Sequence, residues 1–173
     1  IHDPLSVILL DHSEIGLYNL QKHLEKKSGN RKKIIFLLGS IMDRHYLESV
    51  ISKFQIHKVY HAAAYKHVHL VEENIISGVR NNVLGTMNLV NSIRRSSVEE
   101  LVLISSDKAV HPTNVMGATK RLAEMIVLNF AAKESSKIFS LVRFGNVMRS
   151  SGSVIPLFEE QIRSGGPVTV TDG

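Results

Sequence analysis

Short apolar runs alternate along this chain with segments in which apolar residues recur every three or four positions. The runs predict strands at residues 7–11, 33–39, 58–63, 101–106 and 139–146, with a further short strand at 168–171. Most of them are continuous rather than alternating, which is typical of parallel strands that are covered on both faces. The order of strands and helices therefore predicts an α/β fold with one doubly wound parallel sheet in a single domain.

Helices are predicted in the gaps between these strands. Their apolar positions follow the helical period at Ile15, Leu17, Leu20 and Leu24, at Leu47, Val50, Ile51 and Phe54, at Val83, Met87, Val90 and Ile93, and at Leu122, Met125, Ile126 and Leu128. Ser13 is a predicted N-cap of the first helix, because a serine hydroxyl accepts a bond from the unpaired amides there. The fourth helix is expected to begin near Val115, and a later one to reach Ile162.

Composition and charge narrow the possible classes of protein. With 43% hydrophobic and 21% charged residues, the 173-residue chain has the make-up of an ordinary globular domain. It has no cysteine, which excludes a disulfide scaffold and a thiolate metal site, and its nine histidines form no His-Glu-x-x-His zinc array. The net charge of +5 suits an anionic ligand. The basic residues are scattered and not interleaved with aromatic ones, so no nucleic-acid partner is expected.

The glycine-rich turn of a dinucleotide-binding unit does not occur in this sequence, either as G-x-G-x-x-G or as G-x-x-G-x-x-G. Six residues precede the first predicted strand, whereas a strand, turn and helix need roughly 25 to 30. We therefore expect residues 1–173 to be a partial NAD-binding Rossmann domain, truncated at both ends. Asp11, followed by His12 and Ser13, then ends the second Rossmann strand. An acidic residue there binds the adenine ribose and disfavours the 2′-phosphate of NADP, so NAD is the expected cofactor.

Other strand ends carry candidate cofactor contacts. They are Asp43, Ala62, Ala63, Ala64, Lys66 and Asn82. Asp43 either bonds the adenine amine or caps the helix that starts at residue 44. The three alanines leave little side-chain bulk, so either a flat cofactor lies against the backbone or they serve tight helix–sheet packing. Asn82 either caps the third helix or holds the loop at the active site.

The most informative cluster is Ser106-Asp107-Lys108, directly after the strand predicted at 101–106. An adjacent carboxylate and amine perturb each other's pKa, which suits proton transfer in both directions. Lys120 follows on the next helix. Ser153 stands at a predicted helix start, where it either receives a phosphate oxygen or simply caps the helix.

These segments together resemble the polysaccharide-biosynthesis family of UDP-N-acetylglucosamine 4,6-dehydratases, which are extended short-chain dehydrogenase/reductases. The stretches that carry the resemblance are LDHSE (10–14), HAAAYKHV (61–68), RNNVLGT (80–86), ISSDKA (104–109), PTNVMGATKR (112–121) and VRFGNV (142–147). Met116 occupies the place of the tyrosine in the usual Tyr-x-x-x-Lys pair. This is similar to a longer, membrane-anchored branch whose membrane helices precede the dehydratase domain on the cytoplasmic face of a bacterial inner membrane. Such enzymes make 4-keto-6-deoxy sugar nucleotides for capsule, O-antigen or flagellin glycans.

The resemblance implies an NAD-dependent elimination of water from a UDP-sugar. Lys108 would be the base that removes the C5 proton and Asp107 the acid that protonates the leaving C6 hydroxyl. Ser106 would orient the C4 hydroxyl, and Lys120 would hold the nicotinamide ribose. Which group replaces the tyrosine base is open, with Lys120 through a water, or Asp107, as possibilities. The substrate contacts expected are His67, Asn146 and Ser153.

Two other functions remain open from the sequence. A nucleotide-sugar 4-epimerase shares this fold but normally needs the tyrosine at position 116. A regulatory domain that binds a dinucleotide without turnover would explain Met116, but the intact Asp107-Lys108 pair opposes it. We also expect a homo-oligomer.

Overall fold

A computed structural model describes residues 4–27, 33–145, 147 and 154–168 of the chain. Its strands are β1 (Ser6–Asp11), β2 (Lys33–Leu38), β3 (Lys58–His61), β4 (Glu100–Ser106) and β5 (Ile138–Phe144). Its helices are α1 (Glu14–Lys27), α2 (Arg44–Phe54), α3 (Val68–Glu73), α4 (Ile75–Val79), the π-helix η1 (Arg80–Leu84), α5 (Gly85–Arg94), the 3-10 turn η2 (Asp107–Ala109), α6 (Val115–Ala131) and α7 (Val154–Arg163). The predicted strands between residues 7 and 146 are confirmed to within two residues, whereas most of the strand predicted at 168–171 lies outside the described residues.

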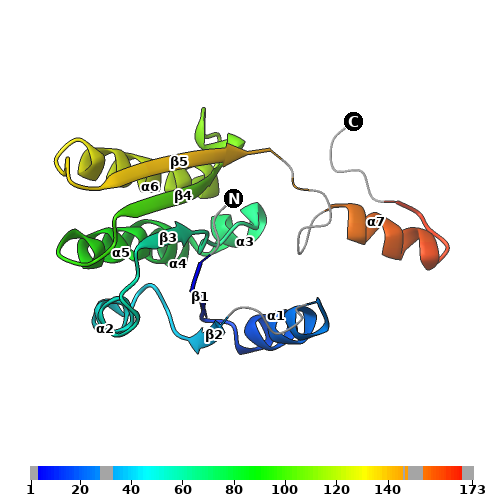
Figure 1. Ribbon diagram of the computed structural model, residues 1–173. Helices are drawn as coiled ribbons and strands as arrows, with labels where there is room; N and C mark the ends of the chain where they lie inside the picture. Colours follow the sequence, from blue (N-terminus) through cyan, green and yellow to red (C-terminus); the bar gives the residue numbers. More distant parts are fainter. Residues whose placement is uncertain (1–3, 28–32, 146, 148–153, 169–173) are drawn as a thin grey trace.

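The strands form two parallel sheets rather than the single sheet that the sequence predicts. β1 pairs with β2, and β4 stands between β3 and β5 (Figure 1). Within the described residues, the second edge of β1 and the second edge of β3 pair with no strand. In the Rossmann order 3-2-1-4-5-6, the first strand stands between the second and the fourth. A first strand outside this sequence would therefore join the two sheets, and this remains a prediction.

The hydrophobic core lies between one face of the β3-β4-β5 sheet and a layer of helices. Leu101 and Leu103 of β4 are buried against apolar residues of α2, α5 and α6. The opposite face carries Tyr60, Val142 and Phe144, which are 61%, 39% and 45% exposed. The expectation that these strands are covered on both faces is therefore wrong for the described part of the chain, because helices cover one side of this sheet.

A continuous helical region from α4 through η1 to α5 replaces the helix that was expected to begin at Asn82. Asn82 lies within the π-helix η1 and is 2% exposed, so it is not an N-cap. Its side chain forms hydrogen bonds with Tyr65 and Thr119 instead of capping the helix. π-helices are rare and often lie at functional sites.

His61 is a buried polar residue at the end of β3, with 3% of its surface exposed. Its Nε2 lies 2.8 Å from the Thr86 hydroxyl, which in turn donates to the Asn82 carbonyl at 2.6 Å. Because that hydroxyl hydrogen is already used, Nε2 carries the proton and donates to Thr86. Burial, and then the charge of Lys120, lower the pKa of His61 to about 4. The ring is therefore neutral at neutral pH.

Acid should destabilise this domain through His61. The pKa of His61 is lower in the folded state than its ordinary value of 6.5, so the stabilisation is complete above pH 6.5 and is lost as the pH falls toward 4. The loss amounts to about 3 kcal/mol over this window. Hydrogen exchange of the β4 and α5 amides in the full-length protein measures it, with His61→Gln as the control because glutamine keeps an N–H donor. If the stability of His61→Gln fell equally steeply between pH 6.5 and 4, other groups would be responsible for the loss of stability in acid.

Candidate functional site

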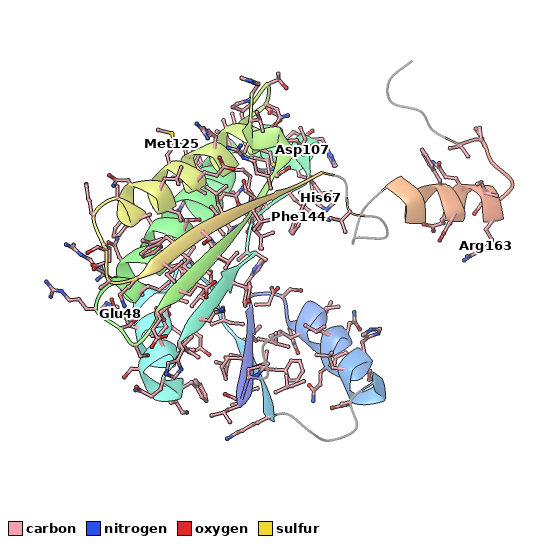
Figure 2. All side chains as sticks on the ribbon, turned by 45° about the horizontal axis from the view of Figure 1, so that its top comes forward. Glu48, His67, Asp107, Met125, Phe144 and Arg163 are labelled. Carbon is pink, nitrogen blue, oxygen red and sulfur yellow. The ribbon has the colours of Figure 1, made fainter. Side chains whose placement is uncertain are left out.

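The candidate site lies where the parallel strands end. Because all strand pairs are parallel, the carboxyl ends of β3, β4 and β5 meet at one edge, which is where ligands bind in open α/β sheets. Figure 2 shows His67, Asp107 and Phe144 near this edge. The rings of His12 and Tyr65 lie edge to face with centroids 6.1 Å apart. The ends of β1 and β3 are therefore neighbours although they belong to separate sheets.

Asp11 presents an ordered carboxylate at the end of β1. Its Oδ1 accepts the Ser13 amide at 2.8 Å and lies 3.5 Å from His12 Nδ1. Its side chain is 52% exposed. Ser13 caps α1 as predicted, since its Oγ accepts the Gly16 amide at 3.0 Å. A solvent-accessible acid at this strand end suits a ribose, and that contact stays a prediction.

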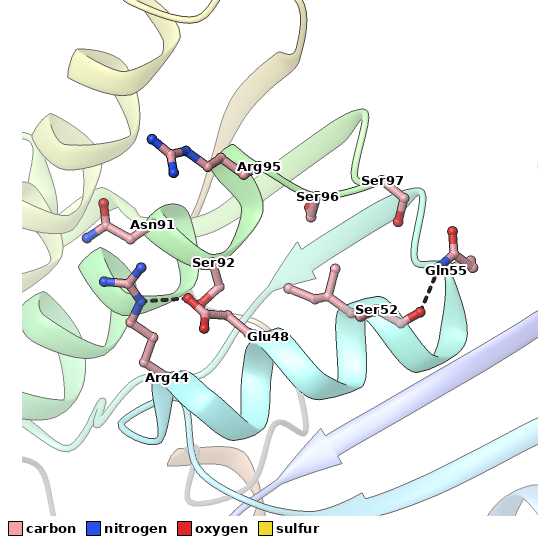
Figure 3. A pocket seen from close by; sticks show the side chains of 10 residues that line it. Arg44, Glu48, Ser52, Gln55, Asn91, Ser92, Arg95, Ser96 and Ser97 are labelled. Carbon is pink, nitrogen blue, oxygen red and sulfur yellow. Dashed lines mark hydrogen bonds and ion pairs between the residues drawn. The ribbon is translucent and has the colours of Figure 1, made fainter.

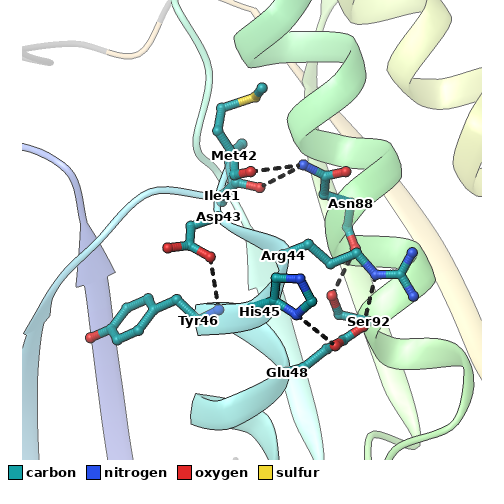
Figure 4. Close-up of polar contacts among 9 residues, drawn as sticks. All are labelled: Ile41, Met42, Asp43, Arg44, His45, Tyr46, Glu48, Asn88 and Ser92. Carbon is teal, nitrogen blue, oxygen red and sulfur yellow. Dashed lines mark hydrogen bonds and ion pairs between the residues drawn. The ribbon is translucent and has the colours of Figure 1, made fainter.

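Asp43 caps α2, accepting the Tyr46 amide at 2.9 Å (Figure 4). The capping alternative is thereby confirmed, while a contact with adenine is untested. The loop before it is fixed to α5, because the Asn88 side-chain amide lies 3.4 Å from the Ile41 carbonyl and 3.1 Å from the Met42 carbonyl. The end of β2 therefore has a defined position relative to the core helices.

Asn82 holds the loop that follows β3. Its Oδ1 accepts the Tyr65 amide at 2.7 Å, and its Nδ2 donates to the Tyr65 carbonyl and to the Thr119 hydroxyl, each at 3.0 Å. These contacts support the loop-holding alternative for Asn82. They also connect the loop to α6 beside Lys120. Within this loop Ala62 and Ala63 are exposed, so their backbone is open to a ligand.

Lys66 and His67 lie in the same loop, Lys66 exposed and His67 half-buried. The ring of His67 lies edge to face with that of His69, with centroids 6.3 Å apart. Within the described part of the chain, no group of three or more His, Asp or Glu residues could hold a metal ion. Asn146 and Ser153 lie outside the described residues, so their expected substrate contacts remain predictions.

Asp107 and Lys108 form an ion pair in the η2 turn, directly after β4. Asp107 Oδ1 accepts the Ser106 hydroxyl at 2.9 Å, the Lys108 amide at 2.8 Å and Lys108 Nζ at 3.3 Å. The hydrogen bond from Ser106 lowers the pKa of Asp107 most. Burial opposes this effect, but the hydrogen bond from Lys108 adds to it, so the pKa lies below its usual range. The side chains of Asp107 and Lys108 are 54% and 39% exposed. The carboxylate is therefore ionised in the free protein and accessible to a substrate.

Gly117 allows η2 to pack closely on α6. A Cβ atom at this position would lie 2.5 Å from the Lys108 carbonyl oxygen, which is closer than real Cβ contacts. The predicted start of α6 is confirmed, with Asn114 as its cap through a 2.8 Å bond from the Gly117 amide. Glu72 of α3 also accepts the Val115 amide at 2.6 Å. The distance between Lys108 and the α6 helix is thus fixed by backbone contact.

Met116 and Lys120 are both buried on α6, with 3% and 8% exposed. Lys120 Nζ donates to the Ile104 carbonyl of β4 at 2.7 Å, and burial lowers the pKa of this amine. The amine therefore points to the strand in this structure, and its expected contact with the nicotinamide ribose is untested. The burial of Met116 agrees with a packing role for the residue that replaces the tyrosine.

Glu124 is a site residue that sequence reasoning missed. It is fully buried, and its carboxylate accepts bonds from Ser105 at 2.6 Å, Arg121 at 3.0 Å and Arg143 at 2.8 and 2.9 Å. Burial raises its pKa, but the hydrogen bonds from Arg143, Ser105 and Arg121 outweigh this effect and lower the pKa to about 2. The helical spacing could have indicated it, because position 124 lies four residues after Lys120 and three before Val127, on the buried side of α6.

A surface hollow of about 540 Å³ lies away from this site, between α2 and the carboxyl half of α5. Polar side chains line it, including Arg44, Glu48, Asn91 and Arg95 (Figure 3). α5 ends next to the start of β4, so the hollow belongs to the opposite end of the strands. It adds no group to the candidate site.

Comparisons with known proteins show the family to which this chain belongs. Residues 2–173 match the family model described as polysaccharide biosynthesis protein. The chain is 48% identical over 169 residues to the capsular polysaccharide biosynthesis protein CapD of Staphylococcus aureus, covering 98% of this chain and 28% of that protein. It is 34% identical over 172 residues to a UDP-glucose 4-epimerase of Rickettsia rickettsii, covering 96% of this chain and 50% of that protein.

Solved structures show the same fold. Pen from Bacillus thuringiensis superposes with a TM-score of 0.88 at 40% identity, covering 98% of this chain and 51% of that chain. DesIV of Streptomyces venezuelae, a dTDP-glucose 4,6-dehydratase with NAD and DAU bound, superposes with a TM-score of 0.81. The latter is 19% identical and covers 96% of this chain and 55% of that chain, so it supports the fold alone. The chain spans 28% of the length of CapD and about half the length of the other three proteins. It belongs to the polysaccharide biosynthesis protein family and has a Rossmann-type α/β fold.

Proposed function

We propose that the full-length protein is an NAD-dependent 4,6-dehydratase that converts UDP-N-acetylglucosamine to a UDP-4-keto-6-deoxy-hexosamine. The observation that carries the proposal is the Asp107–Lys108 ion pair, exposed at the end of β4 and held against the helix that bears Lys120. A carboxylic acid and an amine side by side match the elimination, which needs a proton removed at C5 and a proton supplied to the C6 oxygen.

The described residues fit NAD at the strand ends. Asp11 offers a carboxylate for ribose hydroxyls, and the exposed Ala62 and Ala63 at the end of β3 carry little side-chain bulk. When bound, NAD⁺ would supply the hydride exchange: the hydride leaves C4 as the C4 hydroxyl loses its proton, and it returns to C6 as C5 regains a proton. The resulting C4 ketone acidifies the C5 proton, so a modest base is sufficient for its removal.

The ion pair can provide both the base and the acid. Transfer of one proton from Lys108 Nζ to the Asp107 carboxylate would leave a neutral amine and a neutral acid. The amine then takes the C5 proton, and the acid protonates the leaving C6 hydroxyl, which restores the original pair. In water this transfer costs about 9 kcal/mol from the ordinary pKa values of the two groups. A bound sugar that excludes water from the pair would lower this cost, because desolvation disfavours both charged forms.

A 4-epimerase is the second candidate, favoured by the 34% identity to the Rickettsia enzyme. Epimerisation exchanges hydride at C4 alone, so it would leave Asp107 and Lys108 without work at C5 and C6. Met116 does not separate the two reactions, because both must remove the C4 hydroxyl proton and a thioether can take it in neither.

Two features of the assembled protein also stay predictions. Leu122, Met125 and Leu128 recur every three residues on α6 and are 44%, 53% and 48% exposed, which leaves an apolar side open to a second copy. Figure 2 labels Met125 on this helix. None of the described helices is long and apolar enough to cross a membrane. A membrane anchor would therefore have to come from a part of the protein outside the described residues.

Asp11 should determine the choice of cofactor. In the full-length protein we expect binding of NAD, with a dissociation constant that rises by about tenfold or more in Asp11→Ala, the effect of losing one hydrogen bond to a charged group. Cofactor titration by fluorescence measures this, with Glu14→Ala on the exposed start of α1 as the control. A preference for NADP that Asp11→Ala leaves unchanged would overturn the assignment.

Lys108→Ala and Asp107→Asn should each lower kcat for UDP-N-acetylglucosamine by about 10²-fold or more, as expected for general acid–base groups. Met116→Leu is the comparison variant, because it conserves volume and apolarity and such swaps usually cost less than about 1.5 kcal/mol in stability. It should keep most of the activity. Near-normal turnover by either charge variant would remove that residue from the chemistry, and conversion to UDP-N-acetylgalactosamine would favour the epimerase.

A further inference from the structure

Glu124 connects α6, the helix that carries Lys120, to two strand ends. Its carboxylate lies on α6 and is bonded to Ser105 at the end of β4 and, through both oxygens, to Arg143 at the end of β5. Arg121, one turn earlier on α6, completes the set. A carboxylate that is fully buried yet paired with two guanidinium groups is stable only while these partners stay in place.

Two neighbouring positions of β4 are held by two neighbouring turns of α6. Ile104 receives the Lys120 amine at 2.7 Å, and Ser105 donates to Glu124 at 2.6 Å. Ser106, the next residue, begins the turn that presents Asp107 and Lys108. A shift of α6 along β4 would therefore move Lys120 and the ion pair relative to each other.

We propose that Glu124 is a positioning residue that fixes the Lys120 amine and the 106–108 turn in one mutual geometry. The proposed role in turnover rests on the dehydratase function, whereas the position of Lys120 does not. Glu124 also places a negative charge one helical turn from Lys120, which favours the ammonium form that burial disfavours. His61 at the end of β3 adds no charge to this region at neutral pH, because its pKa is lowered to about 4.

The test must separate positioning from simple stabilisation. Glu124→Gln removes the charge at a fully buried position, and it can unfold the domain because Arg121 and Arg143 both lose their carboxylate partner. The double variant Glu124→Leu/Arg143→Met replaces the ion pair by an apolar pair, an exchange that is often neutral for stability. Glu48→Gln is the matched control, because Glu48 also binds an arginine, Arg44, on the exposed side of α2 (Figure 4).

Two readouts are made on the full-length protein. Nitrogen-15 NMR of the lysine side chains, with Lys120→Arg identifying the resonance, reports the bonded Lys120 amine without any substrate. Steady-state kinetics with UDP-N-acetylglucosamine report turnover. We expect the folded double variant to lose the Lys120 amine signal. Its kcat should fall by about 10- to 100-fold, the effect of a small misplacement, and its KM should change by less than about threefold. Glu48→Gln should match the wild type in both readouts.

A folded double variant with a wild-type Lys120 signal and wild-type kcat would show that Glu124 is structural and overturn the proposal. If neither Glu124 variant folds, Ser105→Ala decides, because it removes one bond to the carboxylate and keeps its charge. An unchanged Lys120 signal and kcat in folded Ser105→Ala would then overturn the proposal, and a loss of both would support it. If the wild type has no turnover, the dehydratase function fails, and the Lys120 signal alone decides the role of Glu124.

Discussion

The buried carboxylate of Glu124 is the interaction on which the rest of the site depends. It ties α6 to the ends of β4 and β5, and its removal would leave two guanidinium groups without a partner. A hydrogen bond to a charged group contributes about 1.5–3 kcal/mol, and the two guanidinium groups stay partly in water when the carboxylate is removed. The close contact of Gly117 with the Lys108 carbonyl acts on the same helix from its other end. Together they leave α6 little freedom to slide, so Lys120 and the ion pair have fixed relative positions.

Around this fixed helix, polar contacts assemble a site from segments far apart in the sequence. Asn82 binds the loop after β3 and reaches Thr119 on α6, and the ring contact of His12 with Tyr65 brings the end of β1 beside that loop. The chemistry expected of the site needs such fixed placement, because acid and base must act on adjacent carbons of one sugar.

Continuous apolar runs predicted the strands well, because parallel strands in this fold are short and are bounded by polar turns. The residue types at the strand ends indicated one candidate region, and the structure brings most of them to the same edge because parallel strands end there. The start of the third helix was wrong, because the side chain of Asn82 is held by tertiary hydrogen bonds that override its preference for a helix cap. Glu124 was missed for a similar reason, as its partners Ser105 and Arg143 lie on other strands. The split into two sheets depends on strand order, which a pattern of apolar residues does not encode.

The most direct test of the proposed chemistry is the reaction in heavy water. The full-length protein is incubated with UDP-N-acetylglucosamine in D₂O, and the product is followed by NMR. If Lys108 removes the C5 proton and the C4 hydride returns to C6, the product is the 4-keto-6-deoxy sugar with solvent deuterium at C5 and the original C4 hydrogen at C6. Formation of UDP-N-acetylgalactosamine without solvent deuterium, or no conversion at all, would contradict the dehydratase account.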